Sequence, residues 1–281
     1  MLLATVAALA MLAQSGDTTL AARRGDRLEA ENHNGNITVR TWARSDVMLR
    51  VSGSRRSVTM DRSGGTISVE LEWEHGDPGN ASYELTVPAW MPLELSGVNS
   101  SIAVTGIRAP ISAETVNGSI VVEGGTGTIN LASVEGSVTL TGADGRIAVE
   151  SVNDDVIVRR SRGEVAGESV NGIVMIDADS RRVSAETVNG DITFSGPVYD
   201  GGTYSFSTHN GSVVLGMQEG ANASVSVSTF QGELLADFPV TIRGSRERGF
   251  SFTTGSGSAR IEVESFQGTI RLVRPSAVRL R

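Results

Sequence analysis

The sequence predicts an all-β protein: a single-stranded parallel β-helix, or solenoid, with coils of about 18–21 residues and an irregular N-terminal β cap. The main observation behind this prediction is a three-residue word that returns every 18 residues. The second is a composition dominated by Gly, Ser, Thr and Val, with 5% aromatic residues and no stretch of helical periodicity. The six copies of the word are Val98-Asn99-Ser100, Val116-Asn117-Gly118, Val134-Glu135-Gly136, Val152-Asn153-Asp154, Val170-Asn171-Gly172 and Val188-Asn189-Gly190.

Each copy of the repeat contains two short strands joined by a glycine-containing corner. Two apolar columns, three and five residues after the Asn, share one strand face because side chains alternate with a period of two. Glycine follows the first strand in several copies, where the chain must turn. The columns are Ile102, Ile120, Val138, Val156, Val174 and Ile192, then Val104, Val122, Leu140, Val158, Ile176 and Phe194; the second strand contributes Ile111, Ile129, Ile147, Val165 and Val183, and the glycines are Gly124, Gly142 and Gly196.

A repeat this short cannot bury its own apolar face, so it has to stack on its neighbours. Stacking places equivalent residues in columns with a spacing of about 4.8 Å. We therefore expect an amide ladder at one corner, with each Asn side chain bonded to the next coil, and a positive φ at the glycine that follows. Asn-Gly is also a strong hairpin signal, but a hairpin fold gives no reason for fixed columns. The expected ladder consists of Asn99, Asn117, Asn153, Asn171 and Asn189.

The repeats lie within a chain of several predicted segments. Residues 1–14 carry an apolar run with small residues near its end, which predicts a secretory signal peptide; a buried helix or short membrane anchor is the alternative. Residues 15–27 read as a polar linker, and residues 28–95 as irregular strands that cap the solenoid. The predicted repeat domain spans residues 96–274, with regular coils over 98–194 and wider coils over 195–274, and residues 275–281 are a tail.

The wider coils are predicted from repeat words that return at longer intervals. Residues 238–248 are expected to bulge out as a loop. The last strands are expected at Arg260–Glu264 and Thr269–Val273, before Pro275 ends pairing. The words themselves are Thr208-His209-Asn210-Gly211, Thr229-Phe230-Gln231-Gly232 and Ser265-Phe266-Gln267-Gly268; in the last two, Phe replaces Val and Gln replaces Asn.

Composition and charge argue against several classes of partner and site. The chain has 281 residues, a formal charge of −8, no Cys and no Lys. This acidic balance argues against nucleic acid as a partner and gives no support to binding at an anionic membrane surface. Without Cys, and with only the scattered His33, His75 and His209, the sequence predicts no transition-metal site and no cofactor.

Paired acidic residues raise the alternative of a carbohydrate-active enzyme. Asp177 and Asp179 are two positions apart, so on a strand they would share a face at roughly 7 Å, a spacing that glycoside hydrolysis can use. The adjacent Asp154 and Asp155 would point in opposite directions. A lyase would instead want a basic cleft, for which Arg159, Arg160 and Arg162 are the nearest candidates. We favour solvated corner positions for the Asp residues, because fold alone licenses no activity.

Three further columns are predicted on the outer surface. Glu114, Glu150, Glu168 and Glu186 share one column, interrupted by Ala132; solvated Glu is the favoured interpretation and a Ca²⁺ site the alternative. A charged column of Arg146, Glu164 and Arg182 should support the register. A half-apolar column is expected to be covered by the N-terminal strands or a loop, with contact to a partner as the alternative; it comprises Val121, Thr139, Ile157, Met175 and Thr193.

Three stretches resemble the DUF4097 family of bacterial β-strand-repeat proteins and the related adhesin head domain called GIN. They are Gly35-Asn36-Ile37-Thr38-Val39-Arg40-Thr41-Trp42, Tyr83-Glu84-Leu85-Thr86-Val87-Pro88 and the run of Val-Asn-Gly words. The resemblance covers roughly Leu28 to Val273. It implies a right-handed, exported β-helix with a role in surface adhesion, and it supplies no catalytic, cofactor or metal residues.

These observations lead to one expected function with two alternatives. We expect an exported, non-enzymatic binding or scaffold module of the cell envelope, whose partner is an envelope glycan or protein. It would be periplasmic, extracellular or on the cell surface, with no membrane insertion after signal removal. The alternatives are a carbohydrate-active enzyme that uses Asp177 and Asp179, and a sensor module in envelope-stress signalling.

Overall fold

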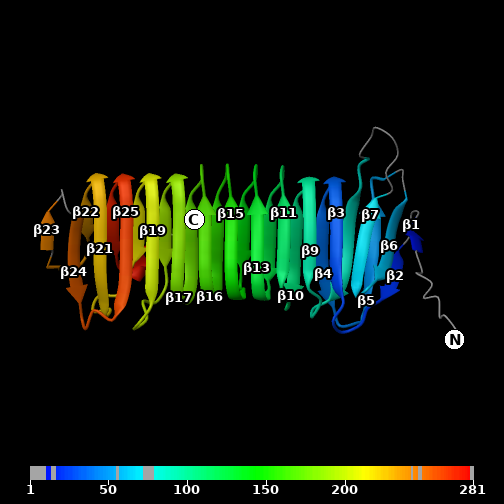
Figure 1. The fold of residues 1–281 in the computed structure, drawn as a ribbon, viewed down its shortest axis with the longest axis horizontal. Helices are drawn as coiled ribbons and strands as arrows, with labels where there is room; N and C mark the ends of the chain where they lie inside the picture. The colour runs from blue at the N-terminus through cyan, green and yellow to red at the C-terminus, as the bar shows by residue number, and fades with distance from the viewer. Residues whose placement is uncertain are drawn as a thin grey trace, which may run out of the picture. The chain divides into compact units, whose positions relative to one another are not determined.

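A computed structural model of the chain describes residues 11–13, 17–54, 57–71, 79–241, 243–245 and 249–278. These residues divide into two compact units: unit 1, Met1–Thr126, and unit 2, Gly127–Arg281. Apart from one short 3-10 turn, η1 (Pro275–Ala277), the regular elements are strands. In each unit the strands stack in parallel as the coils of a solenoid (Figure 1), which confirms the predicted fold class.

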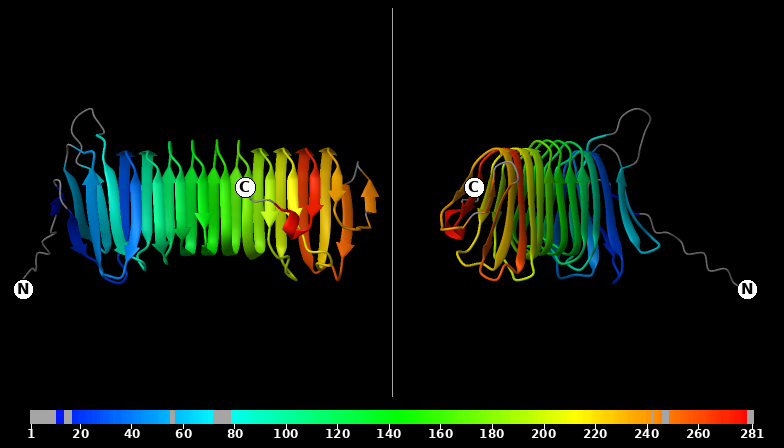
Figure 2. Two further views of the ribbon diagram at one scale, coloured as in Figure 1. Left: turned by 180° about the vertical axis from the view of Figure 1, so that it is seen from behind. Right: turned by 60° about the vertical axis from the view of Figure 1, so that its left-hand side comes forward.

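The regular part of unit 2 follows the 18-residue register of the sequence. Val138, Val156, Val174 and Ile192 lie opposite one another on successive strands. Their side chains are buried. The oblique ribbon view in Figure 2 shows how the backbone of each coil closes around an interior. The strands are β13 (Thr126–Ser133), β14 (Val138–Thr141), β15 (Asp144–Ser151), β16 (Val156–Ser169), β17 (Val174–Asn189), β18 (Ile192–Ser195), β19 (Thr203–Asn210) and β20 (Val213–Gly216).

Buried hydroxyl groups satisfy carbonyl groups at the corner of these coils. In five coils of unit 2, a Ser or Thr donates to a corner carbonyl of the adjacent coil, at 2.9–3.0 Å. A buried carbonyl without such a donor would destabilise the fold. The donors in unit 2 are Ser151, Ser169, Thr187, Thr208 and Ser265.

The expectation of positive φ at the Asn-Gly corner is wrong for the regular repeats. Gly118, Gly172 and Gly190 do not have positive φ. Each is required for space, because a Cβ atom would lie 2.0–2.3 Å from a backbone carbonyl oxygen of the preceding coil. Positive φ occurs instead at the other corner, where Gly145 (φ 145°) and Gly163 (φ 101°) lie.

The end of unit 2 departs from sequence order. β25 (Ala259–Gln267) pairs in parallel with β19 on one side and with β21 (Ala223–Gln231) on the other. β26 (Ile270–Val273) likewise lies between β20 and β22 (Leu234–Ala236). The last coil of the chain is therefore inserted between two earlier ones, as the red β25 between the yellow β19 and the orange β21 shows in Figure 1. The repeat words predicted wider coils over residues 195–274 without an order of stacking, and the strand pairings supply that order.

Antiparallel strands cover the outer edge of β21. β24 (Gly249–Thr254) pairs with β21, and β23 (Arg243–Ser245) pairs with β24. Part of the segment predicted as a loop, residues 238–248, is thus a strand, because it covers an edge that would otherwise be bare. Residues 242 and 246–248 of that prediction lie outside the described residues.

Unit 1 also contains an inserted coil and antiparallel strands that pair with its neighbours. β3 (Arg27–Asn34) lies between β7 (Thr66–Leu71) and β9 (Leu93–Asn99), and β4 (Ile37–Trp42) lies between β8 (Ser82–Pro88) and β10 (Ile102–Ile107). β11 (Ile111–Thr115) and β12 (Ile120–Gly124) continue the stack. The antiparallel strands β5 (Asp46–Ser52) and β6 (Val58–Ser63) pair with β8 and β7, which confirms an irregular N-terminal cap.

The N-terminal predictions are only partly within the described chain. β2 (Thr18–Ala21) pairs antiparallel with β5, so this part of the predicted linker is a strand that covers the edge of the cap. Residues 1–10 and 14 of the predicted signal peptide lie outside the described residues, and β1 (Met11–Ala13) pairs antiparallel with β6. Within the described part of the chain, no helix is long and apolar enough to span a membrane.

Candidate functional site

The main candidate site is a groove along one corner of unit 2. The corner lies at the carboxyl ends of β15, β16, β17, β19, β25 and β21, where each coil contributes an outward residue, a buried Ser or Thr and a second outward residue. Because the strands are in register, the two outward residues form two parallel columns. The first column comprises Glu150, Glu168, Glu186, Ser207, Glu264 and Ser228; the second comprises Val152, Val170, Val188, His209, Phe266 and Phe230.

The first column is acidic. Glu150, Glu168 and Glu186 lie directly opposite one another on β15, β16 and β17, as the sequence predicts. Partial burial, followed by the charges of Glu150 and Glu186, raises the pKa of Glu168 above its ordinary value. In unit 1, Glu114 lies opposite the uncharged Ser96. The three stacked carboxylates therefore carry a repulsion that their own coils do not relieve.

The second column is apolar and ends in an aromatic stack. The rings of His209 and Phe266 are parallel to within 3° with centroids 4.7 Å apart, and those of Phe266 and Phe230 are parallel to within 5° at 5.0 Å. The valines before them are 39–44% exposed, and Phe230 is 73% exposed. Sequence reasoning identified Phe230 and Phe266 only as replacements for Val, and His209 only as a scattered histidine, because their contact depends on the inserted position of β25.

Together the two columns form a groove of about 570 Å³. Its lining includes the carboxylates of Glu168, Glu186 and Glu264, the hydroxyl groups of Ser207 and Ser228, and the rings of the aromatic stack. Among the described ion pairs, none involves these three carboxylates. The groove is thus acidic along one side and apolar along the other.

An amide ladder runs beside the groove. In unit 2, Asn171 donates to Asn153 at 2.9 Å, and Asn189 and Asn210 extend the ladder at 2.8 Å, while Asn153 donates to Glu135 at 2.6 Å. In unit 1, Asn117 donates to Asn99, and Asn99 to Asn34, both at 2.8 Å. The predicted ladder is confirmed within each unit, and Asn34 and Asn210 are additional members.

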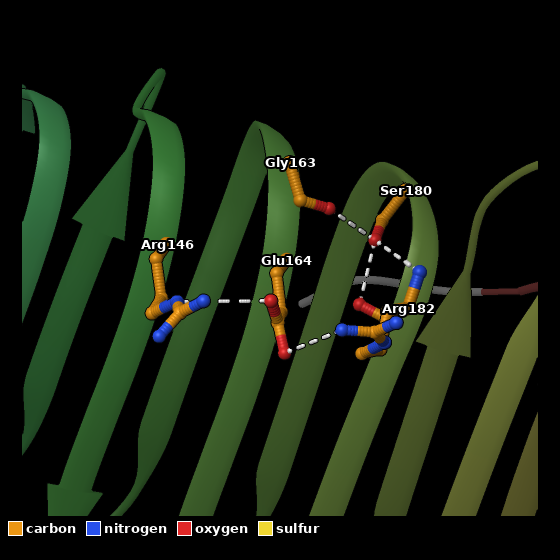
Figure 3. Close-up of polar contacts among 5 residues, drawn as sticks. All are labelled: Arg146, Gly163, Glu164, Ser180 and Arg182. Atoms are coloured by element: carbon orange, nitrogen blue, oxygen red, sulfur yellow. Dashed lines mark hydrogen bonds and ion pairs between the residues drawn. The ribbon is translucent and has the colours of Figure 1, made fainter.

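A different stacked glutamate on the same strands is neutralised. Glu164 lies between Arg146 and Arg182, with N···O distances of 3.7 Å and 3.2 Å (Figure 3). This confirms the predicted charged column. Beside it, the hydroxyl oxygen of Ser180 lies within hydrogen-bond distance of the carbonyl oxygens of Gly163 and Arg182, which share its one proton (Figure 3). The chain therefore places arginines around one glutamate of β16 and leaves the other, Glu168, among carboxylates.

The candidate catalytic pair has other partners. Asp179 accepts a hydrogen bond from the hydroxyl group of Tyr199 at 2.5 Å and lies 3.7 Å from the guanidinium of Arg162. Asp177 is half-buried, and the buried Ala178 separates it from Asp179. Arg162, from the predicted basic cluster, is thus engaged in this ion pair, while Arg160 is exposed.

The remaining predicted site residues are dispersed. Asp154 accepts a hydrogen bond from the backbone of Asp155, and Asp155 from the backbone of Ile173, so both stabilise the corner. His75 lies outside the described residues. Among those described, no group of three or more His, Asp or Glu side chains is arranged to hold a metal ion.

The half-apolar outer column is covered only in part. Met175 of unit 2 is buried, and Thr139, Ile157 and Thr193 are half-buried, whereas Val121 of unit 1 is 49% exposed. The expectation that the chain covers this whole column is therefore wrong at Val121. Unit 1 also has a hollow of about 170 Å³, lined by Glu31, Asn32, His33, Glu70, Leu71, Ser96, Gly97 and Val98.

Comparison with known proteins identifies the family. One similar solved structure is that of a candidate cell adhesion protein from Clostridium sporogenes; it is 8% identical, with 93% of this chain and 100% of that chain covered and a TM-score of 0.22. A search of curated proteins gave no match. The profile of the Toastrack DUF4097 family matches residues 25–273. Because this match spans most of the sequence and both units, the chain belongs to the Toastrack DUF4097 family.

Proposed function

We propose that the protein is an exported, non-enzymatic binding or scaffold module of the cell envelope. The observation that carries this proposal is the pair of exposed columns in unit 2, which repeat at every strand and form a groove. Repeated coils present the same side chains at fixed spacing, which suits an extended partner. The partner would be an envelope glycan or protein, and the module would be periplasmic, extracellular or on the cell surface.

The enzymatic alternative has less support. A carbohydrate-active enzyme that uses Asp177 and Asp179 would need both carboxylates to face one substrate. Asp179 is instead held by Tyr199 and Arg162. We therefore propose a binding role and make shortened glycan an outcome that would overturn it.

Export is tested by fractionation of the native organism. The full chain, with a C-terminal tag, should be recovered outside the cytoplasm, and its first residue should lie after the predicted signal peptide. Recovery of the intact chain in the cytoplasm would contradict the proposal.

Binding is tested by capture from an envelope fraction. The chain from Asp17 onward is immobilised, and the bound protein and glycan are both quantified. Saturable retention of a glycan or a protein supports a binding module, and one stoichiometric membrane protein would favour the sensor alternative. Glycan that returns shortened would show an enzyme, and no retention would contradict a binding role.

A further inference from the structure

We propose that the acidic and apolar groove of unit 2 binds an extended, arginine- or lysine-containing polypeptide segment. Basic side chains of this segment would pair with Glu168, Glu186 and Glu264, and its apolar side chains would pack against the column that runs from Val170 to Phe230. This inference rests on the proposed binding function and names the chemical class of the partner.

Charge complementarity is the first argument. The groove lining contains three carboxylates, and its one basic side chain is His209. On the same strand, Glu164 is neutralised by Arg146 and Arg182, so the fold can stack arginine against glutamate. At Glu168 it stacks glutamate instead. A cationic ligand would relieve the repulsion in this column, which a neutral ligand cannot do.

The apolar column supplies the second argument. Valines and phenylalanines that are 39–73% exposed follow one another at strand spacing beside the carboxylates. A simple cation, such as Ca²⁺, would use the carboxylates and leave this column in water. A peptide with alternating basic and apolar side chains uses both columns, because in an extended chain successive side chains point to opposite sides.

The aromatic stack favours a peptide over a neutral glycan. Neutral sugars pack on the faces of aromatic rings, but here the facing surfaces of His209, Phe266 and Phe230 are in contact with one another. The outer face of Phe230, which is 73% exposed, is suited to a guanidinium group, because arginine stacks on aromatic rings.

Dimensions set the length of the bound segment. The groove crosses five neighbouring strands, β16, β17, β19, β25 and β21, which is four spacings of about 4.8 Å, or roughly 19 Å. An extended chain that rises about 3.4 Å per residue covers this length with roughly six residues, so a seven-residue peptide spans the groove.

The test is a titration of the full chain against a fluorescent seven-residue peptide that alternates Arg and Val, at low ionic strength. We expect saturable binding that weakens as salt is added. E168Q/E186Q/E264Q should weaken it at least tenfold, and F230A about threefold or more. The matched control, E123Q/D144N/D237N, removes the same charge from exposed positions outside the groove and should change affinity less than twofold. Thermal melts confirm that each variant is folded.

Several results would overturn the inference. They are absence of peptide binding, equal losses in the groove and control variants, equal binding of a peptide with Ser in place of Arg, and displacement of the peptide by a neutral hexasaccharide, or by millimolar CaCl₂ when NaCl of the same ionic strength does not displace it. The envelope capture separates the two proposals. If E168Q/E186Q/E264Q captures as well as the parent chain, the binding module stands and the groove assignment fails. If neither captures anything, the proposed function fails whatever the peptide does.

Discussion

Asp26 and Asp17 each accept two hydrogen bonds from one arginine, but they differ in burial. Asp26 is 2% exposed and accepts from Arg62 at 2.7 Å and 2.8 Å, and from the backbone N–H of Arg23 at 2.7 Å. Asp17 is exposed and accepts from Arg50 at 2.8 Å in both bonds. Although burial opposes it, the bonds from Arg62 and Arg23 lower the pKa of Asp26. Both pairs lie in unit 1, so they offer a matched comparison.

We expect D26N to destabilise the protein by about 2 kcal/mol, because it leaves the Arg62 guanidinium without its carboxylate in a partly buried place. This corresponds to a fall in Tm of roughly 4–8 °C. D17N removes an exposed pair of the same geometry and should leave Tm nearly unchanged. Thermal unfolding followed by circular dichroism measures both; equal losses in the two variants would contradict the role assigned to burial.

The Asp26–Arg62 pair predicts that the stability of the protein depends on pH. A carboxyl group whose pKa is lowered by folding contributes stability above its ordinary pKa, near 4, and loses it as pH falls through the folded value. The difference in Tm between the parent chain and D26N should therefore be full at neutral pH and shrink on acidification. A difference that grows toward acid pH would show that another interaction is responsible.

At the scale of one coil, glycine is needed for two different reasons. At the Asn-Gly corner it leaves room for the carbonyl of the preceding coil, as at Gly172. At the other corner Gly163 combines a positive φ of 101° with close approach, since a Cβ atom would lie 2.0 Å from the carbonyl oxygen of Gly145. Gly142 has a positive φ of 71° but no atom within 4 Å of such a Cβ atom.

Substitutions at Gly142 and Gly163 distinguish the energetic cost of backbone strain from the cost of a steric clash. G142A should cost about 1 kcal/mol, the penalty for a left-handed alanine. G163A should cost about 3 kcal/mol or more, because a backbone carbonyl cannot move without breaking the parallel ladder. Denaturant titration of the full chain measures both free energies of unfolding. If G142A and G163A lower the free energy of unfolding equally, the close approach of the Gly145 carbonyl adds no cost beyond that of the positive φ.

Within each unit, a coil near one end of the chain is inserted between two coils that are neighbours of each other in sequence order but not in space. β25 lies between β19 and β21, and in unit 1 β3 lies between β7 and β9. The open edge then belongs to a coil that antiparallel strands can cover, as β24 covers β21. This arrangement protects an edge that could pair with another chain.

Cysteine pairs test this strand order, and the natural chain has no Cys to interfere. Glu262 lies opposite Ser205 on one side and Ser226 on the other, so S205C/E262C and S226C/E262C should each form a disulfide under mild oxidation. S205C/S226C should not, because two strand spacings separate these positions by about 9.6 Å. Mass spectrometry of the oxidised chain distinguishes the cases. A disulfide in S205C/S226C alone would show that the coils stack in chain order.

The class of fold, the 18-residue register, the amide ladder and the stacked columns of Glu168 and Glu164 could all be predicted from the amino-acid sequence. This was possible because identical coils repeat each side chain at a fixed interval, and parallel stacking converts that interval into contact. The position of β25 could not be predicted in this way, and it is this position that places Phe266 between His209 and Phe230 and forms the groove. Where the repeats are no longer 18 residues apart, the sequence does not show which strands become neighbours. Their pairing depends on which strand edges are still exposed, and this is a property of the assembled sheet.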